Sequence, residues 1–361
     1  MTPVDIRVGD ATDRLREMFD KSVNCIVTSP PYWGLRDYGV DGQIGLEPTL
    51  PEFLDRLLTV FEQCHRVLAD DGVMFVNMGD SYAGSRGSAP PSSSSTLQGN
   101  GHVGGGPKIR AMTESRRYDK AQVPRADYRV HGLKPKDMVG QPWRLAFALQ
   151  DAGWYLRQDI IWHKPNPMPE STRDRCTKSH EYLFLLSKSE RYHWDFESMQ
   201  EPVSGTANAR VAGWASGTGG HSTVEHNKGD RKFASKGVGV NHDNHGGAKP
   251  REKYNSSFDA ACAGMVTTRN RRSVWTIQTE GNKDAHFATF PRALVRPCIL
   301  AGCPAGGTVL DPFSGTGTTG VVALELGRKY IGIELNPEYA EMSRKRLAAI
   351  TPGFDFETEA A

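Results

Sequence analysis

The segment Thr308–Thr319 constrains the fold of this chain more than any other feature of its sequence. It opens with the apolar and β-branched run Thr308-Val309-Leu310, which predicts a buried strand that ends at Asp311. Glycines at positions 315 and 317 then predict a tight turn that opens a helix. This order is typical of α/β folds that bind a nucleotide at the carboxyl edge of a sheet. The lysine of a phosphate-binding loop is missing, so such a loop is not predicted here.

The rest of the chain alternates between strand and helix patterns. We expect strands at 5–8, 23–28, 73–76, 155–162, 180–187, 308–310 and 330–333, and helices at 12–19, 51–68, 142–152, 291–300, 318–326 and 337–350. Strands separated by helices predict an α/β fold with a parallel sheet covered on both faces. The 361 residues suffice for one large core with insertions.

A second carboxylate ends the strand that follows the glycine-rich turn. The apolar run Tyr330-Ile331-Gly332-Ile333 leads directly to Glu334. An acid at the tip of this strand is suited to a bidentate contact with ribose hydroxyls. Either element alone could be a tight turn or a helix cap, but the two together favour a nucleoside site.

The expected strand at 23–28 runs into Ser29-Pro30-Pro31-Tyr32. Consecutive prolines fix the backbone and lack N–H groups, so carbonyl oxygens there are free to accept hydrogen bonds from a ligand amino group. Tyr32 offers a flat face on which a base can stack. A diproline at a strand end can also be a simple turn, and Trp33 can either line a pocket or belong to the core.

Two segments are basic and poor in apolar residues. From Lys108 to Lys136 there are nine Lys or Arg against three Asp or Glu, and from Gly205 to Glu280 there are eleven against six. Such segments are either solvated loops or surfaces that meet a polyanion. The Gly/Ser-rich sequence at 81–106 cannot bury enough apolar area to offset its ordering entropy, so we expect a mobile insert there.

Metal and membrane sites are not predicted. The six cysteines include no C-x-x-C pair, and the paired histidines lie in Gly/Asn-rich sequence, which favours a solvated loop. No apolar run approaches the roughly 20 residues of a membrane span, and the first ten residues are charged where a signal peptide is apolar. We therefore expect a cytoplasmic protein with no membrane partner.

The order of the two principal motifs resembles one enzyme family. Ser29-Pro30-Pro31-Tyr32 precedes Phe313-Ser314-Gly315-Thr316-Gly317, as in the circularly permuted β class of S-adenosylmethionine-dependent DNA amino-methyltransferases. That class places a catalytic (S/D/N)-P-P-(Y/F) motif before a cofactor-binding F-x-G-x-G motif. The resemblance covers most of the chain and implies a doubly wound, Rossmann-like methyltransferase fold with a mixed, mainly parallel sheet and loop-rich inserts.

The resemblance also implies a domain plan and a set of site residues. The plan is a catalytic half of the core at 1–80, a flexible basic insert at 81–134, further core at 135–200, a target-recognition region at 201–284 and a cofactor-binding half at 285–361. The expected catalytic residues are Ser29, Pro30, Pro31 and Tyr32, and the expected contacts with S-adenosyl-L-methionine are Asp10, Ala11, His286, Phe287, Asp311, Phe313, Gly315, Gly317, Thr318 and Glu334. Arg269, Arg271 and Arg272 are expected to hold DNA phosphates, and no metal is expected.

The implied reaction is methylation of an exocyclic amino nitrogen on a base flipped out of double-stranded DNA. Serine at the first motif position is associated with cytosine N4 in this family and aspartate with adenine N6. We therefore expect a site-specific cytosine-N4 methyltransferase, with adenine N6 as the alternative. An RNA or protein amino-methyltransferase fits less well because its glycine-rich motif usually comes first, and a non-enzymatic DNA-binding module would not need a complete cofactor strand. No endonuclease motif is evident, so a restriction partner would be a separate chain, and the family often forms homodimers.

Overall fold

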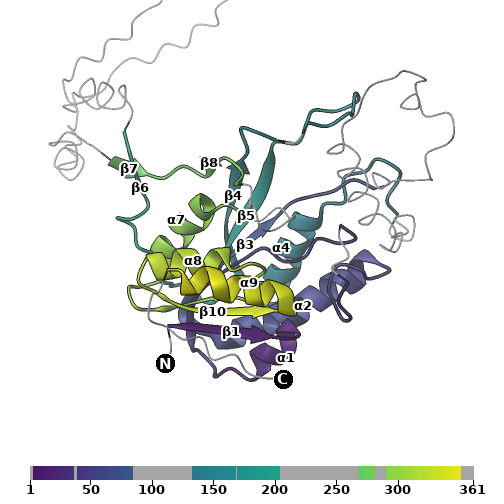
Figure 1. The fold of residues 1–361 in the computed structure, drawn as a ribbon. Coiled ribbons are helices and arrows are strands. Elements are labelled where there is room, and N and C mark those ends of the chain that lie inside the picture. Colours follow the sequence, from purple (N-terminus) through teal and green to yellow (C-terminus); the bar gives the residue numbers. More distant parts are fainter. Residues whose placement is uncertain are drawn as a thin grey trace, which may run out of the picture. The chain divides into compact units, whose positions relative to one another are not determined.

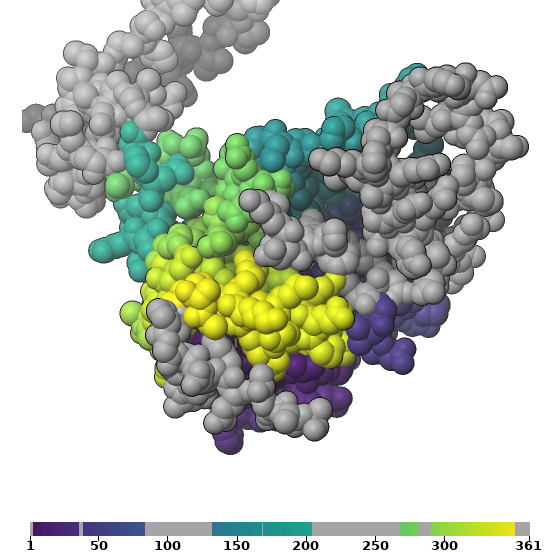
Figure 2. All heavy atoms as spheres, in the orientation of Figure 1, coloured from purple at the N-terminus to yellow at the C-terminus, as the bar shows by residue number. Residues whose placement is uncertain are grey.

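The computed structural model describes residues 3–35, 39–83, 132–167, 169–203, 268–280 and 290–350. The chain divides into two compact units, one made of Met1–Met199 with Arg272–Ala361 and the other of Gln200–Arg271. The first unit therefore unites the two ends of the chain. Figure 2 shows the N-terminal and C-terminal parts, in purple and yellow, lying against one another.

The first unit is built on an eight-stranded sheet with the order β1-β10-β9-β2-β3-β5-β4-β8 (Figure 1). The strands are β1 (Val4–Val8), β2 (Val23–Thr28), β3 (Leu68–Met78), β4 (Tyr155–His163), β5 (His180–Ser187), β8 (Val274–Thr276), β9 (Thr308–Asp311) and β10 (Lys329–Glu334). All neighbours are parallel except that β5 runs antiparallel to both β3 and β4. Every strand except β5 therefore ends at one edge of the sheet, and β5 begins there.

Helices cover both faces of this sheet (Figure 1). The first layer is α1 (Ala11–Arg16), α2 (Leu50–Val67) and α4 (Gln141–Asp151), and the second is α7 (Arg292–Gly302), α8 (Thr318–Glu325) and α9 (Pro337–Ala348). Strand β2 shows why two layers form: Ile26 packs into the core cluster of the first layer, whereas Cys25 and Val27 pack into the cluster of the second. A strand with apolar residues on both faces requires cover on both sides.

The predicted fold class is confirmed: the sheet is mixed, mainly parallel and doubly wound. The expected helices and strands of the first unit are all present, with ends that differ by a few residues. Within the described ranges, no helix combines the length and apolar character that crossing a membrane requires.

The start of β3 differs from the prediction. The sequence predicts a helix at 51–68 and a separate strand at 73–76, but β3 already begins at Leu68 and includes Asp70-Asp71-Gly72. Leu68 pairs with Val23, and the register then shifts before Val73 pairs with Cys25. The three polar residues therefore form an irregularity inside the strand, and the Lys188 ammonium donates to the Leu68 carbonyl oxygen at 2.7 Å beside it.

Strand β8 was not predicted. Its three residues pair with the end of β4, where Trp162 lies opposite Trp275. Strand β8 belongs to the main sheet of the first unit. A three-residue segment is too short to show a hydrophobic period of its own, so its sequence does not predict a strand.

The second unit contains a two-stranded sheet of β6 (Gln200–Pro202) and β7 (Thr268–Asn270). The strands are antiparallel, so Glu201 lies opposite Arg269. The Arg269 guanidinium donates to the Glu201 carboxylate at 2.9 Å. The pairing of the two strands brings Pro202 and Thr268, which flank the segment 203–267, next to one another.

Candidate active site

A cavity of about 350 Å³ lies at the edge where the parallel strands end. Residues from the ends of β1, β2, β3, β4, β9 and β10 and from the start of β5 contribute to its wall. Its polar and aromatic lining includes Asp10, Ser29, Tyr32, Asn77, Trp162, Lys164, Glu181, Phe313, Thr318, Glu334 and Asn336. A cavity at the carboxyl edge of an open α/β sheet is the usual place for a ligand in such folds.

Glu334 at the tip of β10 holds one wall of this cavity in place. Its carboxylate accepts hydrogen bonds from the backbone N–H of Gly315 at 2.7 Å and of Asn336 at 2.9 Å. Burial raises the pKa of the Glu334 carboxyl, and these N–H donors oppose that rise. Each carboxylate oxygen has a second lone pair, so the group can accept further hydrogen bonds from a ligand that enters the cavity.

The glycine-rich turn has open space on its cavity side. Gly315 has a φ of +53°, and a Cβ on it would meet nothing within 4 Å. Gly317 has a φ of +79° and precedes α8, but a side chain there would overlap the Ser343 hydroxyl of α9. The first glycine therefore lets a ligand approach the backbone, and the second lets α8 and α9 pack closely.

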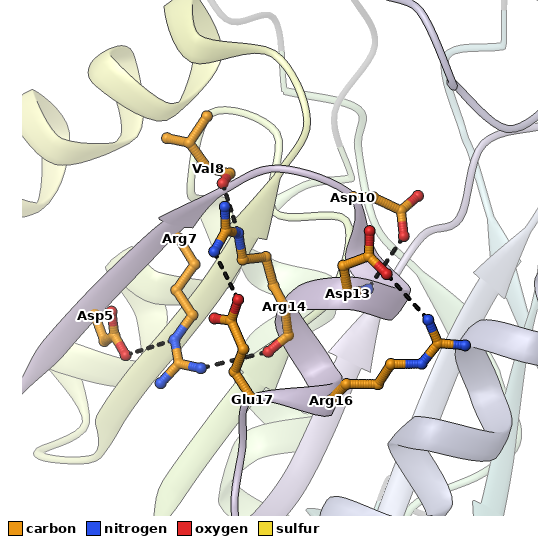
Figure 3. Close-up of polar contacts among 8 residues, drawn as sticks. All are labelled: Asp5, Arg7, Val8, Asp10, Asp13, Arg14, Arg16 and Glu17. Atoms are coloured by element: carbon orange, nitrogen blue, oxygen red, sulfur yellow. Dashed lines mark hydrogen bonds and ion pairs between the residues drawn. The ribbon is translucent and has the colours of Figure 1, made fainter. Parts of the chain in front are cut away.

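Asp10 brings a carboxylate from β1 to the same cavity. It caps α1, and its Oδ1 accepts hydrogen bonds from the backbone N–H of Thr12 at 2.8 Å and of Asp13 at 3.2 Å. Figure 3 shows Arg14 reaching back to the Val8 carbonyl oxygen, a bond of 2.9 Å that ties α1 to the end of β1. Among the described residues, no hydrogen-bond partner is found for Oδ2 of Asp10, so this oxygen can serve a ligand.

The Ser29-Pro30-Pro31-Tyr32 tip forms the opposite wall of the cavity. The Tyr32 hydroxyl donates to Oε2 of Glu181 at 3.1 Å. Burial raises the pKa of Tyr32 well above its usual value, and the Glu181 carboxylate raises it further, so the phenol stays protonated. A Cβ on Gly79 would lie 3.0 Å from the Tyr32 ring, which indicates that the ring packs tightly against the end of β3.

Trp33 is a core residue. Its side chain is 1% exposed, and its indole N–H donates to the Glu47 carbonyl oxygen at 2.9 Å. The side-chain oxygen of Gln141 accepts a hydrogen bond from the Trp33 backbone N–H at 3.0 Å. Trp33 therefore anchors the chain after the tip and does not line the cavity.

Asp311 connects the two walls from behind. Its Oδ1 accepts from the Thr28 hydroxyl at 2.7 Å and from the Phe313 backbone N–H at 3.1 Å, and its Oδ2 accepts from the Thr319 hydroxyl at 2.8 Å. Burial raises the pKa of Asp311 to about 6, and the three donors oppose that rise. Because Thr28 directly precedes Ser29, this buried carboxylate links the serine tip to the glycine-rich turn.

Among the lining residues that the sequence does not predict as site residues are Trp162, Lys164 and Glu181. The Lys164 ammonium contacts the Glu181 carboxylate and lies 4.2 Å from the centre of the Trp162 ring. Which side chains meet there depends on the antiparallel pairing of β4 and β5, in which Trp162 lies opposite Glu181.

The structure brings most of the predicted site residues together. Those that line the cavity are Asp10, Ala11, Ser29, Pro30, Pro31, Tyr32, Phe313, Gly315, Thr318 and Glu334. Asp311 and Gly317 do not line it and instead support its walls. His286 and Phe287 lie outside the described residues. Of the predicted DNA contacts, Arg269 and Arg271 belong to the second unit and Arg272 to the first.

The wall formed by Asp10, Gly315 and Glu334 fits the nucleoside cofactor that the sequence resemblance implies. It combines two carboxylates with acceptor capacity and a backbone turn that a ligand can approach closely. Phe313, packed edge-on to Phe61, adds an apolar surface beside them. Among the described residues, no group of His, Cys, Asp and Glu is arranged to hold a metal ion.

Comparison with known proteins places the chain among DNA-modifying enzymes. A family model described as DNA methylase matches residues 23–345. The chain is 43% identical to the Type II methyltransferase M.Cfr9I of Citrobacter freundii, over 94% of this chain and 86% of that protein. It is 41% identical to the Type II methyltransferase M.SmaI of Serratia marcescens, over 95% of this chain and 90% of that protein.

Solved structures agree in fold. The chain resembles the PvuII DNA methyltransferase (cytosine-N4-specific) with a TM-score of 0.54 and 17% identity, over 99% of this chain and 88% of that one. It also resembles a putative DNA modification methylase of Thermus thermophilus, complexed with S-adenosyl-L-methionine, with a TM-score of 0.52 and 21% identity over 97% and 96% of the two chains. At these identities the likeness concerns the fold alone.

Proposed function

The chain belongs to the DNA methylase family, and we propose that it methylates the N4 amino group of cytosine in double-stranded DNA at a specific sequence. It is a Type II DNA methyltransferase of the N4/N6 amino group, and its methyl donor is S-adenosylmethionine. The alternative target within this family is the N6 amino group of adenine.

One observation carries the proposal. The Ser29-Pro30-Pro31-Tyr32 tip and the glycine-rich turn line the same cavity although almost the whole chain separates them. The 2.7 Å hydrogen bond between Thr28 and Asp311 connects their two strands. An acceptor-rich tip facing a nucleoside-binding wall is what transfer to an amino group requires.

On the cofactor wall, we assign S-adenosylmethionine to Asp10, Ala11, Phe313, Gly315, Thr318 and Glu334, with Asp311 and Gly317 supporting them. When bound, this group supplies a methyl carbon that its sulfonium already activates. The predicted contacts of His286 and Phe287 stay predictions. Ribose hydroxyls are donors, so the Glu334 and Asp10 carboxylates suit them as acceptors.

On the opposite wall, the chain must make a poor nucleophile reactive. The lone pair of an exocyclic amino nitrogen is delocalised into the ring of the base. Hydrogen bonds from the two amino hydrogens to the Ser29 hydroxyl oxygen and the Pro30 carbonyl oxygen localise that pair on nitrogen. The fixed diproline backbone holds both acceptors in position, so that the reacting nitrogen is oriented before transfer.

The base has to leave the duplex to reach this cavity, since a stacked and paired base cannot enter it. Flipping costs a few kcal/mol of unstacking, and stacking on the Tyr32 ring offsets part of that cost. The target-recognition region proposed for 201–284 would read the sequence. Arg269, Arg271 and Arg272 remain the proposed phosphate contacts. The hydrogen bond of Arg269 to Glu201 uses its Nε–H, and a guanidinium has four further N–H donors.

The cytosine assignment rests on Ser29 at the first position of the catalytic motif. Serine there is associated with cytosine N4 in the family, and the cytosine-N4-specific PvuII enzyme shares the fold. The Type II relatives also suggest a role in restriction and modification, with an endonuclease on a separate chain. A homodimer is a further prediction from the family.

Transfer of labelled methyl groups from S-adenosylmethionine tests the proposed substrate class. Purified protein is incubated with duplex DNA, RNA or protein, and incorporated label is counted. We expect label in duplex DNA alone. Label confined to RNA or protein would overturn the proposal.

Replacing Ser29 tests the catalytic tip. Ser29→Ala should lower methylation of DNA by at least about 100-fold, because one acceptor for the amino group is lost. Its affinity for S-adenosylmethionine, measured by calorimetric titration, should stay within about twofold of wild type. Ser22→Ala is the matched control, since Ser22 is a partly exposed serine before the other end of β2 whose hydroxyl donates only to the Phe19 carbonyl oxygen. Loss of cofactor binding together with activity would count against the assignment.

A further inference from the structure

At the cavity wall that carries Ser29 and Tyr32, three further side chains form a connected group with Tyr32, and they have no part in the proposed mechanism: Trp162, Lys164 and Glu181. Glu181 accepts a hydrogen bond from the Tyr32 hydroxyl through Oε2 and contacts the Lys164 ammonium through Oε1. Lys164 lies over the Trp162 ring, 4.2 Å from its centre. All four line the cavity.

The backbone around Lys164 is fixed before any substrate arrives. Lys164 directly follows β4, and its backbone N–H donates to the Ser179 carbonyl oxygen at 2.7 Å. The Trp162 indole N–H donates to the Ile277 carbonyl oxygen at 2.9 Å, and this side chain is 3% exposed. The ring and the backbone therefore hold the ammonium at one place on the cavity wall.

Lys164 has unused donor capacity. An ammonium group has three N–H donors, and the described contacts of Lys164 are the Glu181 carboxylate and the face of the Trp162 ring. Its side chain is only 19% exposed, and its pairing with Glu181 offsets the cost of burying its charge. Among the described residues that line the cavity, Lys164 is the one Lys, Arg or His.

The target base presents acceptors where such a donor is needed. Next to the amino group, the ring edge of cytosine carries N3 and O2, both acceptors. Adenine carries N1 and then a C–H group along the corresponding edge. A fixed cation that contacts the second position favours cytosine, because adenine would leave its N–H donor unpaired.

We propose that Lys164 donates hydrogen bonds to the ring acceptors of the flipped cytosine, O2 above all, and that Glu181 positions both Lys164 and Tyr32. The inference rests on the proposed cytosine-N4 activity and adds to it the residue that reads the base. Lys164 is then a specificity-determining contact. Glu181 acts through its neighbours and is a positioning residue.

The test begins with Lys164→Met, which keeps an unbranched side chain over Trp162 and removes the donors. On duplex DNA that contains the target site, its single-turnover methylation rate should fall by about 10- to 100-fold, the usual range for one base contact. Its affinity for S-adenosylmethionine should stay within about twofold of wild type. Lys345→Met is the matched control, since it removes one charge from an exposed lysine of α9.

A second substrate separates base recognition from other roles. In it the target cytidine is replaced by a 2-aminopyridine C-nucleoside, which keeps the ring nitrogen and the amino group but lacks O2. The methylation rate of wild type should fall on this substrate by about as much as the rate of Lys164→Met falls on cytosine. Lys164→Met should lose little more on the analogue, because the contact is already absent.

Glu181→Gln gives a readout for positioning. The glutamine can still accept a hydrogen bond from Tyr32 but no longer forms an ion pair with the Lys164 ammonium. The ratio of the methylation rate on cytosine to that on the analogue without O2 should therefore fall, while the affinity for S-adenosylmethionine is kept. If Glu181→Gln retains the full wild-type discrimination, the positioning role is overturned.

Three results would overturn the Lys164 contact. Independent, multiplicative losses from the variant and the analogue would exclude an O2 contact. If Lys164→Met lowers the magnitude of the slope of log DNA affinity against log salt concentration by about one unit, Lys164 contacts a phosphate instead. Wild-type rates for Lys164→Met on cytosine would overturn this inference alone, whereas a wild type that methylates adenine or no DNA base at all would overturn the proposed function as well.

Discussion

At the scale of single residues, Asp311 departs most from the role its sequence position suggests. An acid at the end of the strand before a glycine-rich turn predicts a ligand contact, yet its carboxylate is 1% exposed and bonded to Thr28, Thr319 and the Phe313 backbone. The sequence predicts Asp311 as a cofactor contact, whereas the structure places it behind the cavity wall, which it supports without lining the cavity. The sequence could not show which way the carboxylate points, because that depends on Thr28, a residue nearly the whole chain away.

The stability contributed by Asp311 should depend on pH in a defined direction. Its pKa in the folded protein is about 6, above the ordinary value of 3.8, so folding disfavours its ionised form. Above pH 6 this costs about 3 kcal/mol, and the cost fades as the pH falls from 6 towards 4. Asparagine does not titrate. The free energy of unfolding of Asp311→Asn relative to wild type should therefore rise between pH 4 and pH 6 and then level off.

Urea denaturation of both proteins across that pH range measures the difference. Because other carboxylates titrate equally in the two proteins, their contributions cancel. Curves for wild type and Asp311→Asn that stay parallel throughout would show that Asp311 is not a perturbed, buried acid.

At the scale of helices and strands, the hydrophobic pattern of the sequence predicts those elements that are long enough to show a period of their own. Helix α2 buries Phe53, Leu57, Val60, Phe61 and Cys64 on one face, and Thr49 with Glu52 forms the capping box at its start. The three residues of β8 carry no such signal, and only β4 determines their place. Lys164 and Glu181 escaped prediction as contacts for the same reason, since they meet only through strand pairing.

The packing of α8 against α9 makes a prediction at this scale. Gly306 and Gly317 have similar positive φ angles, +72° and +79°, but a Cβ on Gly306 meets nothing within 4 Å whereas one on Gly317 overlaps Ser343. Gly306→Ala should lower the free energy of unfolding by about 1 kcal/mol, which is the cost of backbone strain. Gly317→Ala should lower it by about 2 kcal/mol more, because the helices must move apart.

Chemical denaturation of the two variants provides the comparison. The Ser343 hydroxyl is buried and has no hydrogen-bond partner in the described part of the chain. Adding Ser343→Ala to Gly317→Ala should therefore restore part of the loss. Equal losses for the two glycine variants would refute close packing of α8 on α9 as the reason for Gly317.

At the scale of the whole molecule, the sheet topology assembles the site. Strands from both ends of the chain interleave in the order β1-β10-β9-β2, so the tips that carry Asp10, Glu334 and Ser29 meet at one edge. The sequence allowed this to be predicted because the permuted motif order is specific. In the second unit, Gln200–Arg271, the pairing of β6 with β7 brings the two ends of the unit together.

The pairing of β6 with β7 allows the proposed recognition region to be tested apart from the catalytic core. Replacing residues 204–267 with a short Asn-Gly turn joins the two strands as a hairpin. The shortened protein should keep its affinity for S-adenosylmethionine, measured by the cofactor-dependent rise in melting temperature. Methylation of the specific site should fall by at least about 1,000-fold, because base contacts are lost. Undiminished sequence-specific methylation would place recognition elsewhere.

Identification of the modified nucleoside tests the proposed cytosine-N4 methylation. Duplex DNA is incubated with the protein and S-adenosylmethionine, digested to nucleosides and analysed by mass spectrometry against authentic standards. We expect N4-methyldeoxycytidine, at a level at least about 100-fold lower when Ser29→Ala replaces the wild type. N6-methyldeoxyadenosine in its place, or unmodified nucleosides only, would contradict the proposal.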